Sequence, residues 1–174
     1  MTRDELVATA SSADSMTRSG PRSPWKTRYF IDTEFTDFKD SQLISVAIVS
    51  EDGREFYGER SDFELSACSE FVRATVLPQL GGFPGRSMPA SQLAAELRAW
   101  LLAAPLRPKP VLCYDSHYDY ALVTHLLGGP LPRGWKHENV FLRINAEHFA
   151  QYIAVHGGKH HALHDARANA FAFR

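Results

Sequence analysis

A short apolar stretch that ends in two carboxylates places the strongest constraint on this chain. Tyr29, Phe30 and Ile31 are aromatic or β-branched residues typical of a buried strand, and Asp32 and Glu34 follow them directly. Side chains alternate along a strand, so these two acids point to the same side. Two like charges held that close repel each other, and a divalent cation between them is the usual remedy. The stretch therefore predicts half of a metal site at the end of a core strand.

The composition favours a single globular domain. The chain has 174 residues, of which 44% are hydrophobic and 22% charged, enough for a substantial core. Its formal net charge is -1, so an acidic partner would have to be held locally, by a patch or by metal ions. Bulk charge neither supports nor excludes nucleic acid. The two cysteines, Cys68 and Cys113, form neither a disulfide framework nor a zinc-type spacing.

Two further features concern the ends and the location of the protein. Residues 1–27 are rich in Ser, Thr, Ala and charge, without sustained periodicity, and they are expected to form a flexible N-terminal extension to a folded domain at 28–174. No apolar run approaches the roughly 18 residues of a membrane span, and the N-terminus lacks the apolar core of a signal peptide. A soluble, cytoplasmic protein that does not bind membranes is expected.

Hydrophobic periodicity predicts an α/β fold. The expected strands share apolar or β-branched runs: 28–34, 42–50, 55–58, 110–114 and 140–144. The expected helices are 66–77, ended by Pro78, a helix capped by Ser91 and ended by Pro105, 117–127, ended at 128–129, a helix capped by Asn145 and ended at 157–158, and a last helix at 162–173. Three antiparallel strands followed by parallel crossovers describe a mixed five-stranded sheet flanked by helices.

Two more carboxylates lie where such a fold builds its sites. Asp119 falls in the first turns of the helix after the fourth strand, and Asp165 near the start of the last helix. Four carboxylates without a cysteine or compact histidine cluster favour Mg²⁺ or Mn²⁺ over zinc. Two such ions about 4 Å apart can activate a water and stabilise the leaving oxygen in phosphodiester hydrolysis.

The attacking water needs a base, and two histidines precede Asp165. At about 100° per residue, His161 shares a helix face with Asp165. His160 reaches the same place only from a loop before the helix, and Gly157 and Gly158 allow such a loop. The residues alone leave both histidines open.

These residues resemble the DEDDh family of 3′-5′ exonucleases, which has the ribonuclease H-like fold. Three motifs of that family, Asp-x-Glu, an Asp after a strand, and His-x4-Asp, are matched in order by Asp32 with Glu34, by Asp119, and by His160 with Asp165. The His-x4-Asp spacing of the family selects His160 and not His161. Within the family, the chain is most similar, over most of residues 28–174, to the small polyadenylate-specific 3′-exoribonucleases of actinobacteria, the RNase AS type.

The resemblance implies a role for each matched position. Asp32 would bridge two ions, Glu34 and Asp165 would complete one site, and Asp119 would hold the second ion, partly through water. His160 would deprotonate the water. Phe35 and Thr36 sit where such enzymes contact the 3′-terminal nucleotide, and Phe35 would pack against a base or sugar.

The implied activity is hydrolysis of single-stranded RNA from its 3′ end, with adenosine-rich ends as candidates, by two Mg²⁺ or Mn²⁺ ions, giving nucleoside 5′-monophosphates. A homodimer is common among such proteins. Two alternatives stay open: a DNA 3′-5′ exonuclease of proofreading or repair type, and a nucleic-acid or nucleotide binder without turnover. One departure from the family pattern, Asp115 just before the second motif, leaves that residue as a rival to Asp119.

Each feature also has an ordinary structural explanation. Asp32 and Glu34 could be an exposed strand end, His161 and Asp165 a helix surface pair, and Asp119 an acid favoured by the helix dipole. Their joint occurrence, each at the end of a predicted core element and in the family's order, favours the metal site.

Overall fold

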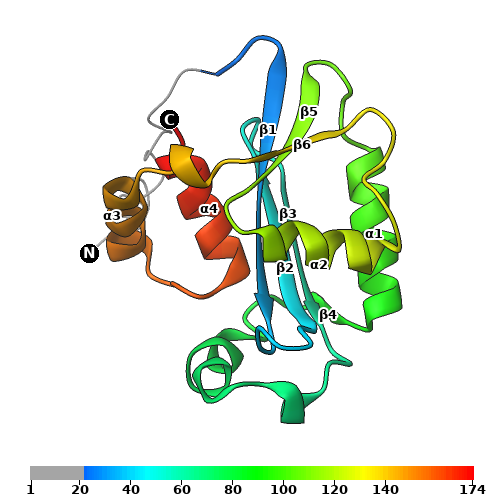
Figure 1. Ribbon diagram of the computed structural model, residues 1–174, viewed down its shortest axis with the longest axis vertical. Helices are drawn as coiled ribbons and strands as arrows, with labels where there is room; N and C mark the ends of the chain where they lie inside the picture. The colour runs from blue at the N-terminus through cyan, green and yellow to red at the C-terminus, as the bar shows by residue number, and fades with distance from the viewer. Residues whose placement is uncertain (1–21) are drawn as a thin grey trace, which may run out of the picture.

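Strand β1 (Lys26–Phe35) lies inside a six-stranded sheet in the computed structural model, which describes residues 22–174 (Figure 1). The strand order is β4-β3-β2-β1-β5-β6. The other strands are β2 (Leu43–Ser50), β3 (Glu55–Arg60), β4 (Ser87–Met88), β5 (Lys109–Tyr114) and β6 (Lys136–Asn139). The β1, β2 and β3 strands form an antiparallel meander, while β5 pairs parallel to β1 and β6 parallel to β5. The expected α/β class and mixed sheet are confirmed.

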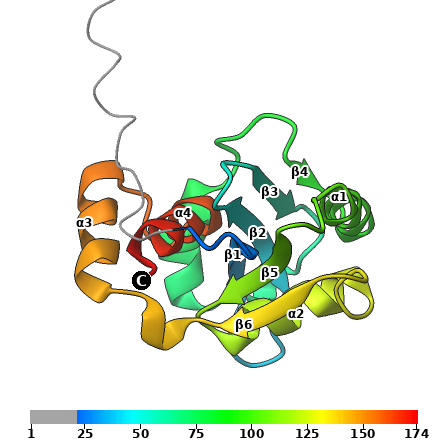
Figure 2. The same cartoon turned by 90° about the horizontal axis from the view of Figure 1, so that it is seen from above.

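Helices cover both faces of this sheet (Figure 2). They are α1 (Ala90–Leu102), α2 (His117–Leu127), α3 (Ala146–His156) and α4 (Ala162–Ala172). The first two lie on one face, α4 lies on the other, and α3 packs on the outside of α4.

Alternation along β1 divides its side chains between these two layers. Tyr29 and Ile31 are fully buried in the core beneath α1, whereas Phe30 packs against Phe173 after α4, with ring centroids 5.2 Å apart. Residues two and four positions after Phe30 continue on its side of the strand. The alternation therefore directs Asp32 and Glu34 toward the α4 layer.

The prediction of a fifth strand at 140–144 was wrong. That segment contains a short 3₁₀ helix, Phe141–Arg143, and the strand beside β5 is the preceding polar segment, β6. The burial of Val140 and an isolated bridge between Ile144 and Phe173 explain the apolar pattern without a strand. The sixth strand, β4, has only two residues and was not predicted.

The prediction of a regular helix at 66–77 was also wrong. The chain there forms a 3₁₀ turn (Leu65–Ala67), a π-helical turn (Val72–Val76) and a second 3₁₀ turn that contains Pro78 (Leu77–Gln79). Ser91 is not the cap of α1, because the helix already begins at Ala90, whose N–H donates to a carboxylate oxygen of Asp62 at 3.1 Å.

Other predicted helix ends are confirmed. The Asn145 side chain accepts from the N–H of His148 at 2.8 Å and caps α3, and Gly128 ends α2 in the left-handed region at φ 68°. Strand β1 begins at Lys26, so two residues assigned to the N-terminal extension belong to the sheet. Residues 1–21 of that predicted extension lie outside the described residues. Within residues 22–174, no helix has the length and apolar character needed to cross a membrane.

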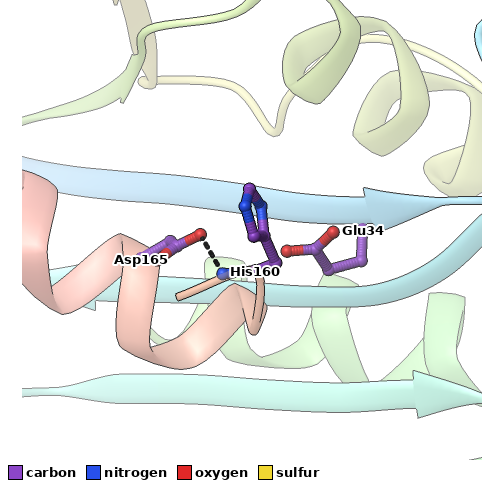
Figure 3. A group of neighbouring side chains, drawn as sticks. All are labelled: Glu34, His160 and Asp165. Atoms are coloured by element: carbon purple, nitrogen blue, oxygen red, sulfur yellow. Dashed lines mark hydrogen bonds between the residues drawn. The ribbon is translucent and has the colours of Figure 1, made fainter. Parts of the chain in front are cut away.

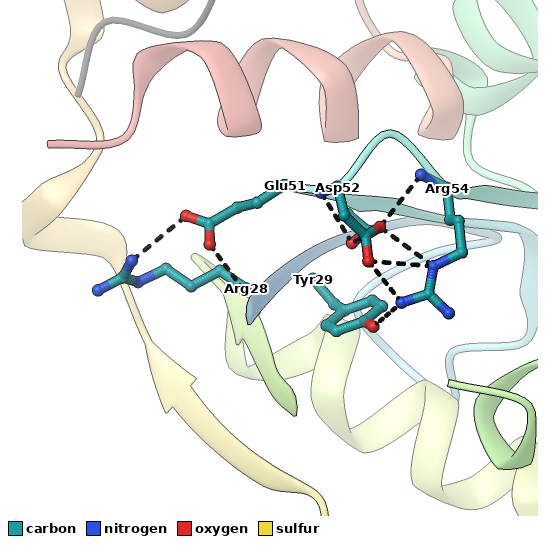
Figure 4. Close-up of polar contacts among 6 residues, drawn as sticks. Arg28, Tyr29, Glu51, Asp52 and Arg54 are labelled. Carbon is teal, nitrogen blue, oxygen red and sulfur yellow. Dashed lines mark hydrogen bonds and ion pairs between the residues drawn. The ribbon is translucent and has the colours of Figure 1, made fainter. Parts of the chain in front are cut away.

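The end of β1 opposite to Asp32 is fixed by polar contacts to the β2–β3 turn (Figure 4). Glu51 accepts from the backbone N–H of Arg28 at 2.9 Å and from its guanidinium at 3.2 Å, and both side chains are buried. The Arg54 guanidinium contacts both Asp52 and the Tyr29 hydroxyl. The start of β1 is therefore held firmly, which fixes the position of its acidic end.

Candidate metal centre

A cavity of about 410 Å³ opens where β1 ends, between the start of α2 and the loop before α4. All five residues expected to carry the chemistry line it, together with the rival carboxylate of the second motif: Asp32, Glu34, Asp115, Asp119, His160 and Asp165. Segments that are more than 100 residues apart in the sequence thus meet in one place.

The donor atoms form two groups. Glu34, His160 and Asp165 each offer one ligand atom, and these atoms lie within 4.8 Å of one another (Figure 3). Asp32, Asp115 and Asp119 form a second group within the same limit. Oxygen-rich sets of this kind suit hard cations such as Mg²⁺ and Mn²⁺.

Asp119 is tied to β1 through the intervening residue of the first motif. Its Oδ1 accepts from the backbone N–H of Thr33 at 3.0 Å and from the Thr33 hydroxyl at 2.6 Å. The last β1 residue paired with β5 is Phe30, so the Thr33 N–H lies beyond the parallel ladder. Asp119 thus joins the helix α2 layer to the strand that carries Asp32, and it is only 3% exposed.

The loop before α4 presents His160 to the cavity. Its backbone has φ 64°, its N–H donates to Oδ2 of Asp165 at 2.9 Å, and its carbonyl accepts from the Gln79 amide at 3.1 Å. The His160 and Phe71 rings form a T-shaped pair, with centroids 5.0 Å apart and an interplanar angle of 90°. The loop position that would make His160 the base is therefore the one observed.

His161 has a structural role instead. It is buried at the N-terminus of α4, where its Nδ1 accepts from the Leu163 N–H at 3.3 Å. Its Nε2 lies 3.2 Å from the Tyr57 hydroxyl, which donates to Glu59 at 2.7 Å. Since Nδ1 accepts, the proton is assigned to Nε2, and the ring is occupied on both sides. His161 does not line the cavity.

Few groups of the described protein neutralise the negative charge of the carboxylates in this cavity. Within residues 22–174, no hydrogen bond or ion pair reaches the side chains of Asp32, Glu34 or Asp115. Burial and then the neighbouring Asp119 raise the pKa of Asp32 well above its usual range. Burial, followed by Asp165 and Asp119, raises the pKa of Glu34 to about 8.

The pKa values of Asp119 and Asp165 are raised as well. Burial raises the pKa of Asp119 to about 7 against the opposing hydrogen bonds from Thr33, and it raises the pKa of Asp165 to about 7 against the His160 N–H. In addition, Oδ1 of Asp165 is buried without a hydrogen-bond partner. An orphaned carboxylate oxygen among mutually repelling acids is the environment that a bound cation relieves, so the residues fit a metal site.

A larger hollow of about 590 Å³, between β3, α1 and α4, lacks this character. Its two carboxylates are paired: Glu55 with Arg167 at 2.7 Å and Glu96 with Arg86 at 3.0 Å. Charge that the protein already neutralises gives no drive to bind a cation, so volume alone does not mark the site.

Aromatic rings surround the mouth of the acidic cavity. Phe35 stacks on Tyr118 with centroids 5.4 Å apart and an interplanar angle of 15°, and Phe38 meets both rings edge-on. Phe38 is 70% exposed and Tyr118 is 41% exposed. These two rings, and Phe71 beside His160, were not singled out from the sequence, although Tyr118 directly precedes Asp119.

Thr36 lies in the interior of the protein. Its side chain is fully buried, and its hydroxyl accepts from the Gln42 N–H at 3.0 Å across the β1–β2 connection. In this structure the side chain supports the turn after the first motif, and a contact of this position with a nucleotide stays a prediction.

The sequence of this chain is similar to those of known 3′-5′ exoribonucleases. None of the known protein-family models matches the chain. Over 67 residues the chain is 45% identical to curated 3′-5′ exoribonucleases from two strains of Mycobacterium tuberculosis. The matched stretch covers 38% of this chain and 36% of each relative's length.

Similar solved structures share the fold. Exonuclease I from Methylocaldum szegediense aligns with a TM-score of 0.56 at 15% identity, over 83% of this chain and 38% of that one. E. coli Exonuclease I in complex with an oligonucleotide gives 0.56 at 12% identity, over 83% and 39%. Cell-death related nuclease 4 gives 0.51 at 18% identity, over 84% and 62%.

The fold, with acids gathered at the end of its first strand, is ribonuclease H-like and is shared with the exonucleases of these solved structures. The matched segment is similar to 3′-5′ exoribonucleases, and the acidic residues that converge in the cavity are those on which the resemblance to the DEDDh family rests.

Proposed function

We propose that this chain is a 3′-5′ exoribonuclease that hydrolyses single-stranded RNA from its 3′ end to nucleoside 5′-monophosphates. The observation that carries the proposal is the convergence of uncompensated carboxylates and His160 in one cavity with aromatic rings at its mouth. The names of the matched relatives, 3′-5′ exoribonucleases, support the direction and the sugar.

The carboxylates would hold two divalent cations, Mg²⁺ or Mn²⁺. The family resemblance implies that Glu34 and Asp165 would serve one ion, Asp119 the other, and that Asp32, whose ligand atom lies with those of Asp115 and Asp119, would reach both. When bound, such ions supply Lewis acidity to the scissile phosphate and the attacking water. The protein contributes the placement of the ligands, which the buried hydrogen bonds of Asp119 and Asp165 fix.

His160 would act as the general base. Burial and the nearby Lys159 lower the pKa of this histidine, so the ring is neutral at pH 7 and its free nitrogen can accept a proton from the attacking water. The hydrogen bonds to its backbone from Gln79 and toward Asp165 hold the loop in place while the ring remains in the cavity.

Phe35, with Phe38 and Tyr118, would receive the terminal nucleotide, because a base of any identity can stack on an aromatic ring. Preference for adenosine-rich ends, similarity to the RNase AS type, a homodimer and a cytoplasmic location remain part of the proposal. The base preference follows from the family resemblance and not from any contact described above.

The test uses oligoribonucleotides labelled at the 5′ end, of oligoadenylate and mixed sequence, with DNA of the same sequences. With Mg²⁺ or Mn²⁺ we expect progressive shortening from the 3′ end of RNA, release of 5′-monophosphates, and no reaction with EDTA. His160→Ala should lower the rate by roughly 10²- to 10⁴-fold. His125→Ala, an exposed histidine on α2, is the matched control. Full activity of His160→Ala, or shortening from the 5′ end, would refute the proposal.

A further inference from the structure

Asp115 occupies a place in the cavity that the family pattern does not explain. It follows the last residue of β5, Tyr114, and precedes Ser116, which caps α2 through its hydroxyl. The capping of α2 therefore does not require the Asp115 side chain. A carboxylate oxygen of Asp115 nevertheless lies within 4.8 Å of ligand oxygens of Asp32 and Asp119.

Nothing in the described protein balances this charge. Within residues 22–174 the Asp115 carboxylate receives no hydrogen bond and forms no ion pair, and its charge helps to raise the pKa of Asp32, Asp119 and Asp165. Oδ1 of Asp165 lies in the same cavity, is buried and has no hydrogen-bond partner within residues 22–174, which is separate support for cation binding in this cavity, on the side of Glu34 and His160. A third acid beside Asp32 and Asp119 is costly unless a cation is bound there.

We propose that Asp115 is a direct ligand of the second cation, so that Asp32, Asp115 and Asp119 together form that site. The inference rests on the proposed function and adds a residue to it. Asp115 and Asp119 then both bind, instead of being rivals. One oxygen of Asp119 already accepts hydrogen bonds from Thr33. The Asp115 carboxylate therefore takes the place of a water molecule that would otherwise complete the coordination shell of the cation. The second cation is accordingly held more tightly than two carboxylates would hold it.

Isothermal titration of the metal-free protein with Mn²⁺ tests this directly. Wild-type protein is expected to bind two ions. Asp115→Asn should weaken one of them by roughly tenfold or more, since even the loss of an outer-shell partner of a metal ligand costs that much. The other ion should bind nearly unchanged. Asp115→Ala is the second variant, and thermal unfolding without metal verifies that each variant folds.

Asp37→Asn is the matched control, because it removes the same charge from the lining of the same cavity. Asp37 belongs to neither group of ligand atoms, and its Oδ1 accepts from the Phe38 N–H. If Asp115→Asn and Asp37→Asn weaken Mn²⁺ equally, or neither does, Asp115 is not a ligand and the inference fails. Wild-type protein that degrades RNA would still satisfy the proposed function in that case, whereas wild-type protein that binds no Mn²⁺ would defeat both.

Discussion

The acidic side chains of this site receive few hydrogen bonds and form no ion pairs within the described part of the chain. Asp32 and Glu34 lie on one side of β1 and have no ion pair with any residue of the described part of the chain, while an oxygen of Asp119 and an oxygen of Asp165 each accept from a backbone N–H. Hydrogen bonds from rigid backbone fix the position of a carboxylate without neutralising it. Oδ1 of Asp165 has no hydrogen-bond partner within residues 22–174 and can meet a ligand.

The exposed ring of Phe38 tests the role of the aromatic mouth. Stacking of a base on such a ring is worth about 1–3 kcal/mol, so Phe38→Ala should weaken binding of single-stranded RNA by roughly five- to a hundredfold. Binding is measured by fluorescence anisotropy with Mg²⁺ in the His160→Ala background, where turnover is suppressed. Phe141→Ala, which removes a ring that is 64% exposed on the 3₁₀ turn after β6, should change binding little. Equal effects of the two changes would contradict this role.

Residue patterns predicted part of this site well. The period of a strand placed Asp32 and Glu34 on one side, and the phase of a helix together with Gly157 and Gly158 left room for His160 on a loop. The choice between the histidines needed the family spacing, because the Tyr57 contact that occupies His161 comes from a distant strand. The burial of Thr36 depends on its contact with Gln42, which adjacent residues do not reveal.

At the scale of elements, the loop between α3 and α4 is the most demanding part of the site. Gly158 has φ 78°, and a Cβ there would lie 2.5 Å from the ring of His164. The loop must pass close to α4 in this conformation for His160 to reach the cavity. A residue without a side chain is therefore required two positions before the proposed base.

Gly158→Ala measures that requirement. The left-handed backbone costs an alanine about 1–2 kcal/mol, and the overlap with His164 adds to it. We expect a larger loss of unfolding free energy in urea than for Gly128→Ala, where φ is 68° and the space is open. The rate of RNA hydrolysis should fall as well, because His160 is displaced. Equal losses of stability for the two variants would show that the close approach to His164 is unimportant.

Elements with strong apolar patterns were predicted and weakly patterned ones were not. Strand β2 is buried along its whole length and was found with nearly its observed bounds. Strand β6 is polar and mostly exposed at the sheet edge, so its four residues carry no hydrophobic signal. The buried Val140 beside it led to the prediction of a strand at 140–144 instead. The two residues of β4 are held by pairing with β3, a tertiary contact.

For the whole molecule, the acidic cavity couples metal binding to stability. The pKa of Glu34 is raised from 4.5 to about 8 in the folded protein, so below that pH the folded state keeps a proton that the unfolded chain releases. Its contribution to stability is complete below pH 4.5 and is lost as the pH rises through about 8. Asp32 acts in the same direction, since its pKa is also raised.

The melting temperature of metal-free protein should therefore decrease from pH 4.5 to about 8 more steeply for wild type than for Glu34→Gln, which cannot ionise. Added Mg²⁺ should stabilise the wild type more at the upper end of that interval, where the carboxylates are free of protons. Differential scanning calorimetry in EDTA and in Mg²⁺ gives both curves. Parallel curves for wild type and Glu34→Gln would be inconsistent with the raised pKa.

The most direct measurement is anomalous X-ray diffraction from crystals of the wild-type protein soaked in Mn²⁺. Two peaks are predicted in the cavity at the end of β1, one bound by Glu34 and Asp165 and one by Asp115 and Asp119, with Asp32 in contact with both. Diffraction that located Mn²⁺ only elsewhere on the molecule, with these carboxylates free at a saturating concentration, would contradict the account.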